Sequence, residues 1–115
     1  MKTVNILGTK YKVIKGSADK YPQLKKADGY CDHSIKQIVI LDCGIYKDDV
    51  TRIKDLESCE KKVARHEVIH AFIYESGLWV NSFSVDDWAT NEEMTDWLAI
   101  QSPKIFKAFQ ELGIM

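Results

Sequence analysis

The sequence predicts an α+β domain in which a small antiparallel sheet packs against helices, and two observations lead to this class. Between residues 4 and 44, short apolar and β-branched runs alternate with turn residues, which is typical of strands joined as hairpins. From about Val50 onwards, apolar residues recur at helical spacing instead. Because each such helix buries only one apolar stripe, we expect the helices to pack on the sheet in a single core.

Two hairpins and a short helix are expected in the N-terminal half. The first hairpin runs from Val4 to Ile14 around Gly8-Thr9, with Gly8 in the first loop position of a type II′ turn. A short helix is expected around Tyr21 to Lys26. The second hairpin would pair Gly29 to Cys31 with the β-branched run Gln37 to Leu41.

Two further helices are expected near the C-terminus. Thr90 and Glu93 have the spacing of a capping box, which predicts that a helix begins there. Ser102-Pro103 has the pattern of an N-cap followed by proline at the first helical position, so it predicts another helix, which would end at Gly113. The expected order is therefore four strands followed by three helices.

Length, charge and cysteine content narrow the class of protein. The chain has 115 residues, which suits one domain spanning residues 1–115. Sixteen Lys and Arg nearly balance seventeen Asp and Glu, so the formal net charge is only -1. A charge this small does not indicate nucleic acid or a membrane surface as a partner. Three cysteines without CxxC spacing fit reduced thiols, and the N-terminus lacks the apolar stretch of a signal peptide. We therefore expect a cytoplasmic protein.

The longest helical pattern ends near Gly77 and contains the sequence HEVIH. His66 and His70 are four residues apart, which is about 40° around a helix and one turn along it, so both imidazoles point into the same space. Glu67 is turned by about 100° from His66, which places its carboxylate beside that space. This arrangement of two histidines and a glutamate on a helix is typical of a zinc site.

Zinc explains why these residue types occur at this spacing. A catalytic zinc ion has three protein ligands and one open position, in which it lowers the pKa of a water molecule to about 7. His66 and His70 would supply two ligands to one Zn²⁺ per chain, and Glu67 would act as general base rather than as a ligand. The alternative is that the two histidines only line a polar face of the helix.

The third ligand is not settled by HEVIH itself. His33 lies in the expected turn of the second hairpin, where we expect a solvated residue, with metal ligation or stabilisation of an oxyanion as the alternatives. Glu75 is excluded, because nine residues from His66 place it on the opposite side of the helix. The long metzincin pattern is also excluded, because Ser76 stands where its third histidine would be.

The next helix offers better candidates. Glu92 and Asp96 are one turn apart, so the first can bind zinc while the second orients a histidine ligand. If Glu93 completes the capping box with Thr90, its carboxylate is directed at its own backbone, which favours Glu92 as the ligand. Asp96 has the alternative role of a carboxylate stabilised by the helix dipole.

HEVIH at residues 66–70 and NEEMTDWLA at residues 91–99 together resemble the ImmA/IrrE-like metallopeptidases, in particular the minimal forms encoded by phages and prophages. The resemblance covers roughly Lys61 to Lys107. These enzymes are gluzincins, so the resemblance implies a minimal zincin-like domain with HExxH on the active-site helix. It also implies that His66, His70 and Glu92 bind zinc, that Glu67 is catalytic and that Asp96 supports a ligand.

The expected function is hydrolysis of a protein substrate. The resemblance implies cleavage of a transcriptional repressor of the same phage or mobile element in the host bacterial cytosol. An extended peptide would add to an exposed sheet edge above the metal. Trp79, Phe83 and Trp88 would either line a substrate pocket or only close the core, and Trp97 is expected to pack in the same way. The alternatives are a zinc-binding interaction module without proteolysis and a structural protein with an accidental motif.

Overall fold

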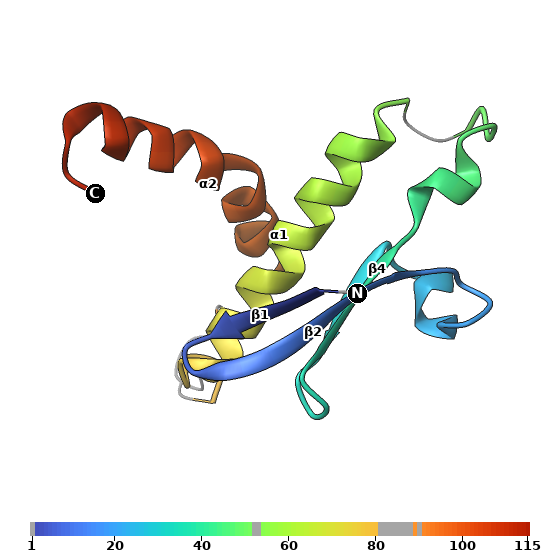
Figure 1. Cartoon of the computed structure of the whole chain (residues 1–115), viewed down its shortest axis with the longest axis horizontal. Helices are drawn as coiled ribbons and strands as arrows, with labels where there is room; N and C mark the ends of the chain where they lie inside the picture. Colours follow the sequence, from blue (N-terminus) through green and yellow to red (C-terminus); the bar gives the residue numbers. More distant parts are fainter. Residues whose placement is uncertain (1, 52–53, 81–88, 90) are drawn as a thin grey trace.

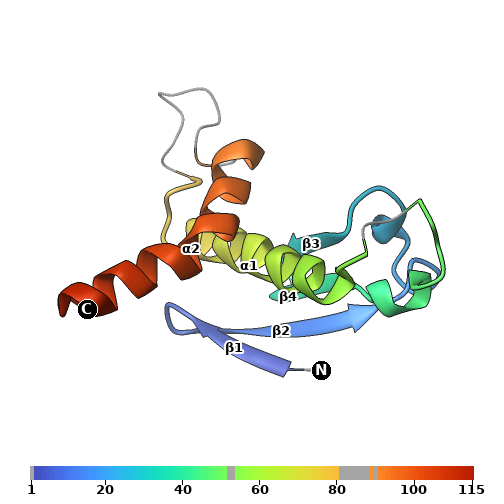
Figure 2. The same cartoon turned by 90° about the horizontal axis from the view of Figure 1, so that it is seen from above.

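A computed structural model describes residues 2–51, 54–80, 89 and 91–115 of the chain. It contains a four-stranded sheet packed against two helices, and the sequence HEVIH lies in the first of them. Helix α1 lies on one face of the sheet and α2 packs against α1, as Figures 1 and 2 show. The α+β class is therefore confirmed. The elements in chain order are β1 (Lys2–Ile6), β2 (Thr9–Gly16), η1 (Pro22–Lys25), β3 (Gly29–Asp32), β4 (Gln37–Leu41), η2 (Cys43–Tyr46), α1 (Leu56–Glu75) and α2 (Glu92–Leu112).

The turn between β1 and β2 differs from the expected type. Ile6 pairs with Thr9, so the two loop residues are Leu7 and Gly8, with φ angles of 51° and 94°. Positive φ at both central residues defines a type I′ turn rather than type II′, and Gly8 occupies its second position. Ile6 is completely buried, so burial of the core face selects this register.

The sheet is mixed rather than wholly antiparallel. Its strand order is β1-β2-β4-β3, and the two hairpin pairs are antiparallel as expected. β2 and β4, however, are parallel, with Ile14 opposite Val39. Four consecutive residues of β4, from Ile38 to Leu41, are buried, which is the pattern of a central strand covered on both faces. This position for β4 leaves β3 at the edge of the sheet.

Side chains on both faces of the sheet are buried. One cluster lies between the sheet and α1 and consists of Ile6, Tyr11, Ile38, Ile40, Val63 and Ala71. The other face is covered by η1 and its flanking residues, where Leu24 packs with Val39 and Leu41. The expected short helix near Tyr21 to Lys26 is thus confirmed as η1, and it forms the cover for the second face.

Helix α1 begins later than the apolar pattern indicated. Asp55 is its N-cap and accepts a hydrogen bond from the Ser58 N–H at 3.0 Å, so the helix starts at Leu56 rather than near Val50. Ser76 is the C-cap, and Gly77 follows with a φ of 80°. The expected glycine at C′ is therefore confirmed.

Helix α2 begins at a different cap from the one expected. Its N-cap is Asn91, whose side-chain oxygen accepts a hydrogen bond from the Met94 N–H at 2.8 Å. Glu93 is consequently at N2 rather than N3, so it is not the reciprocal partner of a capping box. Thr90 lies outside the described residues.

The residues expected to form two C-terminal helices form one, because α2 continues through Pro103. Proline has no N–H, so it leaves the carbonyl of Ala99, four residues earlier, without its helical donor. Arg65 of α1 supplies the donor instead, since its Nε bonds to the Ala99 oxygen. Figure 2 shows that α2 bends along its length, as a helix with an internal proline does.

Replacing Arg65 by Met should destabilise the protein by about 1–3 kcal/mol, because the carbonyl of the buried Ala99 loses the donor that Arg65 supplies. Chemical unfolding measures this cost. In a Pro103→Ala background, residue 103 can donate to Ala99 again, so Arg65→Met should cost clearly less there. An equal cost in both backgrounds would show that Arg65 acts through something other than this carbonyl.

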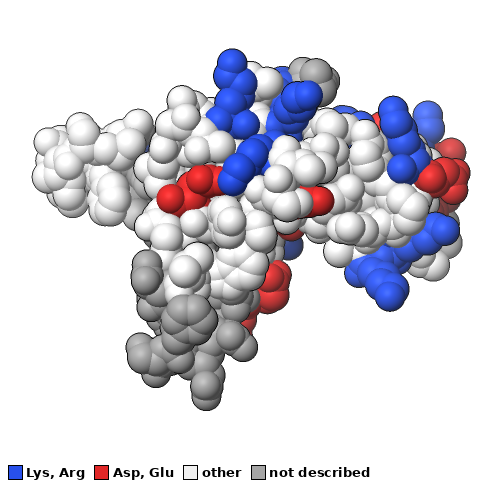
Figure 3. Space-filling model, turned by 90° about the horizontal axis from the view of Figure 1, so that it is seen from below, with Lys and Arg blue, Asp and Glu red and all other residues white. Residues whose placement is uncertain are grey.

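The C-terminal part of α2 extends away from the rest of the domain (Figures 1 and 3), and its surface is almost uncharged in the view of Figure 3. Large apolar side chains are exposed along it, namely Phe106, Phe109 and Leu112. Trp97, expected to pack in the core or at its rim, is 55% exposed, so it is not a core residue. No helix that the structure describes is long and apolar enough to cross a membrane.

Candidate metal centre

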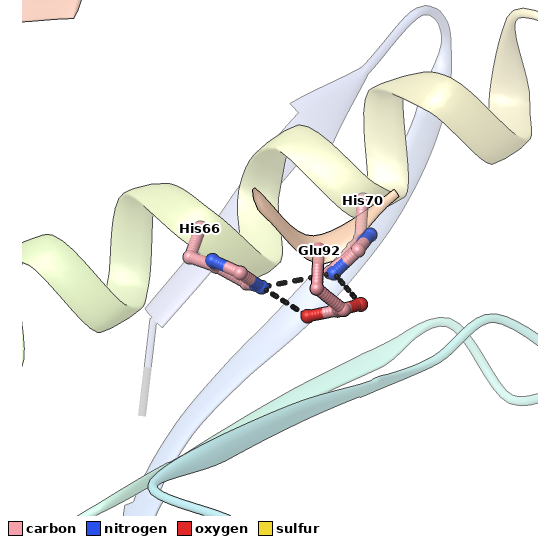
Figure 4. Close-up of side chains that lie close together, drawn as sticks. All are labelled: His66, His70 and Glu92. Carbon is pink, nitrogen blue, oxygen red and sulfur yellow. Dashed lines mark hydrogen bonds and ion pairs between the residues drawn. The ribbon is translucent and has the colours of Figure 1, made fainter. Parts of the chain in front are cut away.

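Two helices bring three potential metal ligands together. His66 and His70 lie one turn apart on α1, and Glu92 is the first residue of α2. The Nε2 atoms of the histidines are 3.0 Å apart, and the Glu92 oxygens lie 2.9 Å from His66 Nε2 and 3.0 Å from His70 Nε2. Figure 4 shows the three side chains pointing toward one another. They form a group that can hold a metal ion.

The spacing and chemistry of this group fit zinc. Bonds of about 2.0–2.1 Å in a tetrahedron separate ligand atoms by about 3.4 Å. The three donor atoms therefore need to move apart by only a few tenths of an ångström. Burial lowers the pKa of His70, with the Glu92 charge acting in the opposite direction, so the neutral imidazole that binds metals is favoured. The structure thus shows a His-His-Glu group consistent with a zinc site of the HExxH type.

Asp96 lies one turn after Glu92 and contacts the other side of His66. Its carboxylate is 3.3 Å from His66 Nδ1 and also accepts a hydrogen bond from Lys62 Nζ at 3.1 Å. Burial acts to raise the pKa of Asp96, but Lys62 and His66 together hold this pKa below its usual range. An ionised Asp96 favours the tautomer with a proton on Nδ1, so the Nε2 lone pair of His66 is directed at the metal position.

Glu67 lies beside the group without belonging to it. Its residue is only 6% exposed, and the structure describes no hydrogen bond to its carboxylate. Edge strand β3 passes directly over it, since a Cβ on Gly29 would come within 3.2 Å of Glu67 Cγ and 2.7 Å of Val63 Cγ1. Burial raises the pKa of Glu67 to about 7, while His66 acts to lower it and Glu92 to raise it. Such a pKa suits a group that accepts and returns a proton near neutral pH.

The metal-free protein should lose stability as the pH rises from about 4.5 to about 7, because the pKa of Glu67 is about 7 in the folded protein against an ordinary value of 4.5. The folded state therefore binds more protons in this window than the unfolded state does. Glu67→Gln removes the ionisation, so it should stabilise the metal-free protein at pH 8 by up to about 3 kcal/mol and change little at pH 4.5. Urea unfolding with a chelator tests this, and identical pH profiles for both proteins would contradict it.

The other candidate residues lie elsewhere. Glu93 is exposed and outside the described metal group. Glu75 faces the sheet, where it accepts hydrogen bonds from Tyr11 and Lys36, each at 2.7 Å. His33 is not the solvated turn residue that was expected, because its ring stacks on Tyr74.

Sequence reasoning missed this packing of His33, although a signal was present. Gly29, Cys31 and His33 alternate along β3 and its end, so they share one face. Tyr74 follows His70 by four residues and therefore lies above it on α1. The two periodicities together indicate that His33 and Tyr74 lie beside the motif.

A cavity of about 410 Å³ borders the metal group. It lies between β3 and α1, and Glu67, His70 and Glu92 are at one end of its lining, with His33 and Trp79 also contributing. A smaller cavity of about 200 Å³ shares Gly29, Glu67 and Glu92 with it and continues to Lys62 and Asp96. The two form a groove that follows β3 past the metal group. Phe83 and Trp88, the other aromatic residues considered for a pocket, lie outside the described residues.

Fold and site together define the chain as an α+β domain with a potential metal site on its first long helix. No family model matches the sequence, and neither a curated protein nor a solved structure matches it. The function has therefore to be inferred from the site itself.

Proposed function

We propose that the protein is a zinc-dependent peptidase in which His66, His70 and Glu92 bind zinc and Glu67 is the general base. The observation that carries this proposal is the position of Glu67. Its carboxylate is buried beside three converging ligand side chains, and it lines the same groove as they do. A metal site with a purely structural role would not need a buried, uncoordinated carboxylate at this point.

The chain's own residues divide the chemistry among them. When bound, zinc would supply activation of water and polarisation of the scissile carbonyl. Glu67, with a pKa of about 7, takes up the proton released from the attacking water and delivers it to the leaving amine. Asp96 holds His66 in the tautomer that directs Nε2 at the metal. Burial of Glu67 keeps its proton affinity high.

Edge strand β3 provides a means of binding an extended peptide. The Leu41 N–H donates to the Asp28 oxygen at 2.8 Å, so the residue pair Asp28 and Leu41 is hydrogen-bonded. Because bonded and non-bonded pairs alternate along an antiparallel ladder, the backbone groups of Gly29 and Cys31 are directed away from β4. These two residues also line the groove. A peptide that pairs with Gly29 and Cys31 would lie across the position of Glu67.

The substrate that we propose is a protein rather than a small molecule. The groove is open and follows a strand edge, which fits a chain in extended conformation. The resemblance of HEVIH and NEEMTDWLA to ImmA/IrrE-like metallopeptidases supports a repressor encoded by the same phage or mobile element as the natural substrate. Such a substrate would meet the enzyme in the bacterial cytosol.

Metal removal and restoration test the proposal. Purified protein should contain about one zinc per chain by elemental analysis. It should cleave an unfolded casein, or a repressor with an exposed linker, lose this activity after dialysis against a chelator, and regain it with added zinc. Bound zinc without cleavage of either substrate would favour a non-proteolytic zinc-binding module, and a lack of zinc binding would overturn the proposal.

A further inference from the structure

The cavity beside the metal group has an aromatic end built around His33. The His33 ring stacks on Tyr74, with ring centroids 3.8 Å apart and planes inclined by 10°. Trp79 lies edge-on to the His33 ring, with ring centroids 4.6 Å apart, and its ring centroid is 5.3 Å from that of Tyr74. All three residues line the cavity that contains Glu67 and His70. Flat apolar walls of this kind favour a flat apolar ligand group.

The turn that carries His33 is held in place by contacts with α1. Lys36, at the end of this turn, has a φ of 56°, which a non-glycine residue adopts only when its surroundings hold it there. Its Nζ lies 2.7 Å from a Glu75 oxygen and 5.0 Å from the centre of the Tyr74 ring. Glu75 is in turn bonded to the buried Tyr11. His33 is therefore a fixed part of the cavity wall.

Burial of one ring nitrogen indicates how His33 can contact a ligand. Its Nδ1 is buried and has no hydrogen-bond partner among the residues that the structure describes. An unpaired N–H is more costly to bury than an unpaired lone pair, so the proton is favoured on Nε2. Nε2 is then the ring nitrogen that can meet a ligand in the cavity, and it acts as a hydrogen-bond donor.

The charges around the cavity disfavour an acidic ligand group. Glu67 and Glu92 line it near the metal group and would repel an acidic side chain. An uncharged aromatic side chain does not meet this penalty.

We propose that this cavity binds an uncharged aromatic side chain of the substrate, next to the bond that is cleaved. This inference rests on the peptidase function proposed above. His33 selects for a polar group on that ring through a hydrogen bond from Nε2, so tyrosine is preferred over phenylalanine. His33 is thus a specificity-determining residue, and Tyr74, Lys36 and Glu75 are its positioning residues.

Binding of short peptides tests this inference without requiring cleavage. The probes are capped peptides Ac-Ala-Ala-X-Ala-Ala-NH₂ in which X is Tyr, Phe, Leu, Glu or Lys, titrated by NMR into zinc-loaded Glu67→Gln protein and into metal-free wild type. The Tyr peptide should bind about 3- to 10-fold more tightly than the Phe peptide, as one hydrogen bond provides. The Glu peptide should bind most weakly.

His33→Phe is the matched variant, because it retains a ring against Tyr74 and removes only the donor. It should bind the Tyr and Phe peptides equally, whereas Ser34→Ala in the same turn should keep the preference for Tyr. In case His33→Phe fails to fold, ¹⁵N shifts of the wild-type imidazole provide a second reading, and they should show a proton on Nε2 and none on Nδ1.

The outcomes separate the two proposals. Equal binding of all five peptides, an unchanged preference in His33→Phe, or a proton on Nδ1 would overturn the role of His33 even if the protein cleaves casein. A preference for Tyr that His33→Phe abolishes would support the pocket even if no cleavage is detected, in which case only the peptidase proposal fails.

Discussion

Glu67→Gln should leave the zinc content of the protein unchanged and lower its rate of peptide cleavage by about 10²- to 10⁴-fold, the usual contribution of a general base. Glutamine has nearly the shape of glutamate, so the cavity beside β3 keeps its packing. It cannot accept the proton that the attacking water must release. Because Glu67 lies beside the His-His-Glu group rather than in it, the substitution removes no metal ligand.

Elemental analysis and initial rates on one unfolded substrate, measured at saturating zinc, give the two readouts. Glu57→Gln is the matched control, since Glu57 lies in the first turn of the same helix with its side chain 79% exposed. This control should retain full activity. A Glu67→Gln protein that cleaves at the wild-type rate would remove Glu67 from the mechanism, and one that loses zinc would show that Glu67 is a ligand.

Glu92→Gln should weaken zinc binding by at least about 10²-fold. Loss of a residue that merely supports a ligand already costs about 10- to 100-fold in metal affinity, and Glu92 supplies a donor atom itself. Its oxygens lie 2.9 and 3.0 Å from the two histidine Nε2 atoms. The described group of His66, His70 and Glu92 contains no second carboxylate that could replace it. The affinity can be measured by competition with a chromophoric chelator.

Variants of two neighbouring carboxylates serve as comparisons for Glu92→Gln. Glu93→Gln should bind zinc like the wild type, because Glu93 is exposed and does not face the histidines. Asp96→Asn should give an intermediate loss, of about 10- to 100-fold, because Asp96 only orients His66. If Glu93→Gln weakened zinc binding as much as Glu92→Gln, the third ligand proposed here would be wrong.

Glu92 was favoured over Glu93 for a reason that the structure contradicts, although the structure does group Glu92 with the two histidines. The sequence favoured Glu92 because Glu93 appeared to close a capping box with Thr90. The structure has Asn91 as the cap, yet it still brings Glu92 to the histidines. What directs Glu92 to the histidines is the angle at which α2 meets α1. Two hydrogen bonds between the helices hold this angle, one from Lys62 to the Asp96 carboxylate and one from Arg65 to the Ala99 carbonyl. Neither contact is visible in the spacing of a single helix.

The sequence by itself determined whatever depends on local periodicity. His66 and His70 share a face because of the helical repeat, Glu75 lies on the opposite side for the same reason, and Gly77 ends α1 because glycine readily adopts positive φ. These features need only the backbone geometry of one segment.

Only the tertiary structure decided which segments meet. The parallel pairing of β2 with β4 leaves β3 at the sheet edge, and this brings Gly29 over Glu67 and His33 against Tyr74. Pro103 lies inside α2 because a side chain of α1 provides the hydrogen bond that the proline cannot. These outcomes depend on burying both faces of β4 and on pairing polar groups between elements, and such requirements act between residues far apart in the sequence.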